Sequence, residues 1–150
     1  TEYQGVDLLL EVIGRLAGCR NDFHALLMGY PEEDYVEKAR SKGLLGNVTF
    51  TGKIDYSEAP RYLALGDLAI SLKLSATEAN GKLLNFMACG LPCIVFDNQV
   101  NRELLGDVGY YAKQGDLDDV QRVVIDLLNR EDDLVERSLQ IRERAVALHA

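Results

Sequence analysis

The chain alternates from start to finish between short apolar runs and longer segments in which apolar residues recur at helical spacing. Short continuous apolar runs are typical of buried strands, and the recurring pattern is typical of amphipathic helices. The predicted strands cover residues 23–28, 47–51, 67–72, 93–96 and 109–111. The predicted helices cover residues 6–16, 31–41, 57–65, 81–89 and 100–105, a segment from 116, and the tail from 130. This order predicts an α/β, Rossmann-like three-layer domain with a parallel β-sheet flanked by helices.

Length and composition fit one domain spanning residues 1–150. The 47% hydrophobic fraction is enough for a core, and 16 basic against 24 acidic residues give a net charge of −8. That charge argues against nonspecific binding to nucleic acid. The apolar runs fall well short of the ~20 residues that a membrane helix needs, and no basic-then-apolar leader opens the chain. We therefore expect a soluble domain with a cytoplasmic location.

The cysteines indicate neither a disulfide framework nor a metal site. Cys19, Cys89 and Cys93 are an odd, widely spaced set, and no C-x-x-C motif is present. The two histidines, His24 and His149, add too few ligands for a zinc shell. We expect no bound metal and a reducing compartment.

One loop contains most of the functional information. In parallel α/β sheets, ligands bind outside the carboxyl ends of the strands, and residues 75–81 follow a predicted strand and open a helix. Asn80 is a good candidate to cap that helix, and Gly81 lets a ligand approach the backbone. The amides of Gly81, Lys82 and Leu83 and the Lys82 charge would favour an anion such as phosphate. Capped helix starts of this kind also occur where no ligand binds.

Glu78 and Asn85 extend the phosphate hypothesis to a larger ligand. They are seven residues apart, on the order of 10 Å along a helix. That span fits a nucleoside diphosphate sugar, with Asn85 at the ribose, the helix-start amides at the phosphates and Glu78 at the sugar hydroxyls. The alternatives are a solvated loop carboxylate for Glu78 and a surface amide for Asn85.

An ordered set of motifs resembles the carboxyl-terminal domain of group 1 (family four) retaining glycosyltransferases. The signature of that family is a strand, a serine, a glutamate, a glycine, a second glutamate and then Ala-Met-Ala-Cys-Gly-x-Pro. The similarity runs from about Tyr3 to Leu128. The matching segments are Gly5-Val6-Asp7-Leu8-Leu9-Leu10, Asn47-Val48-Thr49-Phe50-Thr51-Gly52, Asp67-Leu68-Ala69-Ile70-Ser71-Leu72, Glu78, Phe86-Met87-Ala88-Cys89-Gly90-Leu91-Pro92-Cys93-Ile94-Val95 and Asn101-Arg102-Glu103-Leu104-Leu105.

The resemblance implies one half of a GT-B enzyme, namely the donor-binding domain. The partners would be a nucleotide sugar and an N-terminal acceptor domain of the same enzyme. By the same resemblance, we expect residues 1–150 to contain neither that acceptor domain nor the first strand of the donor domain. The whole enzyme would transfer a sugar with retention of configuration and without a required metal or other cofactor. Glu78 would be the catalytic residue that orients the donor sugar, and Gly29, Lys53 and Ile54 would lie at the nucleobase. The donor sugar, nucleobase, acceptor and any membrane contact of the parent enzyme stay open.

Two positions depart from the family pattern. Asn85 stands where the family has its second, ribose-binding glutamate, and Lys82 stands where the family has an apolar residue. The first departure keeps a second hypothesis open, a catalytically inactive glycosyltransferase-like nucleotide-binding or interaction module. A dehydrogenase is disfavoured because no G-x-G-x-x-G follows an early strand, and a phosphoacceptor domain would need more acidic residues at the strand ends.

The charged tail carries an apolar stripe of its own. Leu134, Ile141, Ala145 and Leu148 fall on one side of the predicted last helix. We expect part of this helix to be poorly packed or to rest on a neighbouring chain.

Overall fold

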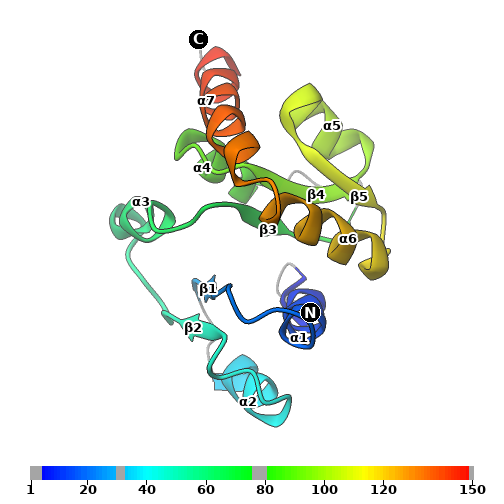
Figure 1. Cartoon of the computed structure of the whole chain (residues 1–150). Coiled ribbons are helices and arrows are strands. Elements are labelled where there is room, and N and C mark those ends of the chain that lie inside the picture. The colour runs from blue at the N-terminus through cyan, green and yellow to red at the C-terminus, as the bar shows by residue number, and fades with distance from the viewer. Residues whose placement is uncertain (1–4, 30–32, 76–80, 149–150) are drawn as a thin grey trace.

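The computed structural model describes residues 5–29, 33–75 and 81–148 (Figure 1). Its strands are β1 (Ala25–Leu27), β2 (Val48–Phe50), β3 (Ala69–Ser71), β4 (Cys93–Asp97) and β5 (Tyr110–Lys113). Its α-helices are α1 (Val6–Ala17), α2 (Glu33–Ser41), α3 (Ala59–Leu63), α4 (Gly81–Ala88), α5 (Gln99–Leu105), α6 (Leu117–Leu128) and α7 (Glu131–Leu148). Two short 3-10 helices, η1 (Tyr56–Glu58) and η2 (Gly106–Val108), complete the order.

All paired strands are parallel, as the alternating pattern predicts. β1 pairs with β2, and β3, β4 and β5 form a second set with β4 in the centre. Within the described residues no hydrogen bonds join the two sets. The register aligns Ile70 with Ile94 and Ile94 with Tyr110, so β3, β4 and β5 end at the same edge.

The three-layer arrangement is clearest around β4. Successive strand residues point to opposite faces, and the first four residues of β4 are at most 1% exposed. Ile94 and Phe96 belong to the core that α1 and α6 cover. Cys93 and Val95 belong to the core beneath α4 and α7. Burying a side chain of this size stabilises the fold by roughly 1.5–3 kcal/mol, so the covering layers are held firmly on the sheet.

Helix α1 connects the two strand sets. Its buried residues Val12 and Leu16 face the core of β3–β5, while Leu10 and Ile13 face a third core formed with α2, β1 and β2. Figure 1 shows α1 beside β1 and below α6. The β1–β2 unit is therefore attached to the rest of the chain through helix packing.

The structure corrects the expectation of a poorly packed tail in part. Leu134, Ile141 and Ala145 are buried within this chain, whereas Leu148 is exposed. α7 packs across α4, and Arg144 donates to the carbonyl oxygens of Leu104 and Glu103 at 2.6 and 3.0 Å. A different apolar set on α7 is exposed: Val135, Leu139 and Val146.

Candidate functional site

Helix α4 begins at Gly81, beyond the carboxyl end of β3, which agrees with the sequence prediction. The first amides of any α-helix have no acceptor within the helix. Leu83 is fully buried, so only its backbone could contact a ligand. Glu78 and Asn80, the residues predicted to contact the sugar and to cap the helix, lie outside the described residues.

Lys82 is an exposed cation at this helix start. The surrounding atoms displace part of its water, and this desolvation lowers the pKa of its ammonium group below the ordinary value. Within the described residues, no carboxylate forms an ion pair with Lys82. An anion held here would restore some of the interaction energy that the ammonium group loses with its water.

The far end of α4 is fixed by its glycine. Gly90 has a φ of +72°, and its N–H donates to Met87 O at 3.0 Å while Leu91 N–H donates to Phe86 O at 2.9 Å. These two bonds form a Schellman motif, which explains why a glycine stands in the Met87-Ala88-Cys89-Gly90 motif. Ser138 of α7 donates to Gly90 O, so α4 is anchored where it ends.

The structure brings the predicted residues Gly29, Lys53 and Ile54 to one place. Gly29 follows β1, and its N–H donates to the carbonyl of Gly52, which follows β2, at 3.1 Å. Lys53 and Ile54 come directly after Gly52, with Lys53 exposed and Ile54 half-buried. Because β1 and β2 are parallel neighbours, their carboxyl ends lie at the same edge, and the segments that follow them meet there.

Tyr56 is a residue of this region that the sequence reasoning missed. It lies on η1, two residues after Ile54, is 81% exposed, and its hydroxyl donates to Asn85 Oδ1 of α4 at 3.4 Å. This contact connects the segment after β2 to the predicted ribose residue. In the sequence, the only indication of this contact is that an aromatic residue follows the predicted Lys53-Ile54 segment. That indication does not identify Asn85 as its partner.

Asp97, at the carboxyl end of β4, is committed to a structural pair. Arg102 donates two hydrogen bonds to its carboxylate, at 2.7 and 2.8 Å, and also lies over the Tyr111 ring. The Arg102 hydrogen bond lowers the pKa of Asp97 below its usual value. An anionic, already paired carboxylate offers little to an anionic ligand.

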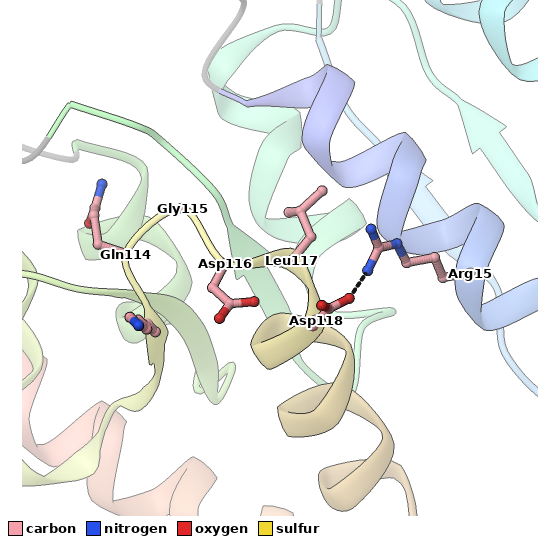
Figure 2. A pocket seen from close by; sticks show the side chains of 7 residues that line it. Arg15, Gln114, Gly115, Asp116, Leu117 and Asp118 are labelled. Carbon is pink, nitrogen blue, oxygen red and sulfur yellow. Dashed lines mark hydrogen bonds and ion pairs between the residues drawn. The ribbon is translucent and has the colours of Figure 1, made fainter.

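An open pocket of about 480 Å³ lies at the loop between β5 and α6 (Figure 2). Its lining consists of Arg15, Lys113, Gln114, Gly115, Asp116, Leu117 and Asp118, and Arg15 pairs with Asp118. None of the residues that the sequence nominated lines it. One lining residue, Gln114, reaches from this loop to the stem of the β3–α4 loop.

The described residues contain no group of three or more His, Cys, Asp or Glu side chains placed to hold a metal ion. None of the helices in the described ranges combines the length and apolar character that crossing a membrane requires.

The parallel α/β layers and the helix that begins at the carboxyl edge of β3 define a Rossmann-like domain of the kind found in GT-B glycosyltransferases. The family model for glycosyl transferases group 1 matches residues 1–130. The chain therefore belongs to the group 1 glycosyltransferase family. A search of curated proteins finds no matching relative.

Solved structures share the fold at low sequence identity. A mutant of S. aureus TarM, crystallised with fondaparinux, α-GlcNAc-glycerol and UDP, matches with a TM-score of 0.87 and 19% identity, over 100% of this chain and 31% of that one. Anabaena HepE with UDP and glucose matches with a TM-score of 0.76 and 19% identity, over 99% and 40%. The catalytic domain of the Helicobacter pylori cholesterol-α-glucosyltransferase matches with a TM-score of 0.82 and 16% identity, over 99% and 92%. This chain thus spans less than half of the TarM and HepE chains.

Proposed function

We propose that this chain is the donor-binding domain of a retaining glycosyltransferase and that it binds a nucleoside diphosphate sugar at the carboxyl edge of the sheet. The observation that carries the proposal is the start of α4 at Gly81 with Lys82 beside it, a cation whose ammonium group is partly desolvated. Backbone amides and a cation together suit a diphosphate. Membership of the family and the likeness to structures solved with UDP support the same ligand class.

The remaining candidate residues take their roles from this arrangement. Asn85 contacts the ribose, and Gly29 with the Lys53-Ile54 segment contacts the nucleobase through the backbone. Glu78 holds the hydroxyls of the donor sugar and is the catalytic residue. The positive charge at Lys82 stabilises the departing diphosphate as the sugar is transferred. A second, acceptor-binding domain of the whole enzyme completes the cleft.

The test is a calorimetric titration of this chain with UDP, GDP and ADP. Lys82→Ala should weaken diphosphate binding by about 1–3 kcal/mol, the range for losing a charged hydrogen bond. Lys42→Ala is the matched control, because it removes the same charge just beyond the end of α2, where Lys42 pairs with Glu11 of α1 at 3.5 Å. Unchanged affinity in Lys82→Ala, or no binding of any of the three nucleotides by the wild type, would overturn the proposal.

Two further variants separate the roles at the site. Asn85→Ala should weaken binding of the ribonucleoside diphosphate and spare the 2′-deoxy analogue. Glu78→Ala should leave diphosphate binding unchanged and abolish sugar transfer in the full-length enzyme. Full transfer activity in the Glu78→Ala enzyme would remove the catalytic assignment.

A second candidate function is a nucleotide-binding module that has lost catalysis. Asn85, a neutral amide whose Oδ1 accepts from Tyr56, favours it, because the family resemblance places a carboxylate there. Nucleotide binding by this chain without transfer by the full-length protein, tested with a panel of nucleotide sugars, would support this function over the first.

A further inference from the structure

Three loops at the carboxyl edge of the β3–β5 set are joined by a relay of side-chain amides. Asn98, which follows β4, donates from Nδ2 to Gln114 Oε1 at 3.0 Å. Gln114, which follows β5, donates from Nε2 to the carbonyl oxygen of Leu74 at 2.9 Å. Leu74 lies on the segment that leads from β3 toward the start of α4. The relay therefore connects the segment after β3, which leads to the proposed donor site, to the segments that follow β4 and β5.

The orientation of every amide in the relay is determined by a helix cap. Asn98 is the N-cap of α5, and its Oδ1 accepts from Asn101 N–H at 2.9 Å. Its NH2 group must therefore face Gln114, which in turn must present Oε1 to Asn98. That leaves the NH2 group of Gln114 to donate to Leu74, whose carbonyl can only accept.

Gln114 also stands on a rigid base. Asp116 N–H donates to Lys113 O at 2.9 Å and closes a tight turn, in which Gly115 has a φ of +74°. Asp119 accepts from Lys113 N–H at 2.7 Å, and Asp116 caps α6 by accepting from Asp119 N–H at 3.0 Å. Figure 2 shows Gln114 on this turn, with its amide directed away from the Arg15–Asp118 pair.

We propose that Gln114 is a positioning residue of the donor site, holding the stem of the β3–α4 loop in the register that sugar-nucleotide binding requires. This inference rests on the proposed function. The Leu74 side chain is 45% exposed, so apolar burial contributes little to holding it, and the hydrogen bond to its carbonyl restrains the backbone instead. Restraining the stem at Leu74 reduces the conformational entropy that this stem must lose when a ligand binds.

Two charge-changing variants break the relay at different bonds. Gln114→Glu keeps an acceptor for Asn98 but replaces the donor to Leu74 with a second oxygen. Asn98→Asp keeps the α5 cap, since aspartate caps helices well, but removes the donor to Gln114. Gln114 then turns its NH2 group toward the new carboxylate and loses Leu74. Gln121→Glu, on the body of α6, is the control for the added charge.

The variants are compared with wild type by amide hydrogen exchange over residues 68–75 without ligand, by urea unfolding, and by titration with UDP, GDP and ADP. Both relay variants should speed exchange at residues 74 and 75 and weaken nucleotide binding about three- to tenfold, the effect of one lost hydrogen bond. The urea unfolding midpoint of each relay variant should fall slightly, because the same hydrogen bond contributes to stability, and Gln121→Glu should match wild type in all three measurements. A purely structural role would lower the midpoint and leave affinity unchanged.

The outcomes separate this inference from the proposed function. Exchange at wild-type rates in both variants would overturn the relay itself. Faster exchange with unchanged nucleotide affinity would overturn the positioning role and leave the donor site standing. A wild-type chain that binds none of the three nucleotides would overturn the proposed function, and the positioning role with it, whatever the exchange data show.

Discussion

At the scale of single residues, Cys93 shows how burial decides chemistry. It opens β4, is 1% exposed, and donates from Sγ to Leu91 O at 3.1 Å. Burial raises the pKa of the Cys93 thiol to about 12. Cys19, in contrast, lies exposed just beyond the end of α1. The structure therefore predicts different reactivities for two residues of the same type, which no local sequence pattern distinguishes.

We expect an aromatic disulfide reagent at pH 8 to modify Cys19 rapidly and Cys93 only after unfolding. The reason is that the thiolate is the nucleophile. In folded Cys93 the raised pKa keeps the thiol protonated, and burial keeps the reagent away from the sulfur. Cys19→Ser is the control and should remove the rapid reaction at Cys19, which mass spectrometry distinguishes from any reaction at the half-buried Cys89. Rapid modification of the folded Cys19→Ser protein at Cys93, located by mass spectrometry, would contradict the structure.

The same thiol makes a pH-dependent contribution to stability. Its pKa is higher in the folded chain than in the unfolded chain, so the contribution is complete below about pH 9. It is lost as the pH rises toward 12, by up to about 1 kcal/mol per pH unit. Cys93→Ala should accordingly show a shallower loss of unfolding free energy between pH 8 and 10 than the wild type.

At the scale of elements, α7 presents two apolar faces with different environments. Ile141 is fully buried against α4, whereas Leu139 is 63% exposed on the outer side. The helical spacing of apolar residues identifies the apolar stripes but does not indicate which stripe packs against another element of the fold. The sequence reasoning selected the buried stripe and expected it to be poorly covered, because it could not foresee how closely α4 approaches.

Truncating one residue on each face of α7 tests this packing. Ile141→Ala should lower the free energy of unfolding by about 2–4 kcal/mol, because it leaves a cavity in the core. Leu139→Ala should change it by less than about 0.5 kcal/mol, as is usual for exposed positions. Urea unfolding followed by circular dichroism measures both values, and similar costs at the two positions would contradict the described packing.

At the scale of the whole molecule, the two strand sets share α1 instead of a continuous sheet. Ile13 faces the core of β1–β2, and Val12, the preceding residue, faces the core of β3–β5. Leu9 and Phe23 pack against both cores. Because α1 contributes side chains to both cores, a mutation that destabilises one core should also destabilise the other.

We expect Ile13→Ala to speed hydrogen exchange both at Leu26 of β1 and at Val95 of β4, and to leave a single urea transition. The reason is that the two cores unfold cooperatively through α1. Exchange is measured by NMR, with Val36→Ala as a milder control variant, because Val36 of α2 is only partly buried. Faster exchange confined to β1 and β2 would show that they open as an independent unit.

The sequence by itself determined the order of strands and helices, their parallel arrangement, the start of α4 at Gly81 and the family. These depend on the periodicity of apolar residues and on short motifs, which are properties of neighbouring residues. The tertiary structure decided which loops meet at the carboxyl edge: Gly29 with Gly52, Tyr56 with Asn85, and Gln114 with Leu74. It also divided the strands into two sets and chose the face of α7 that is buried. Such contacts join residues tens of positions apart, and they form only where packing brings the loops together, so no local pattern records them.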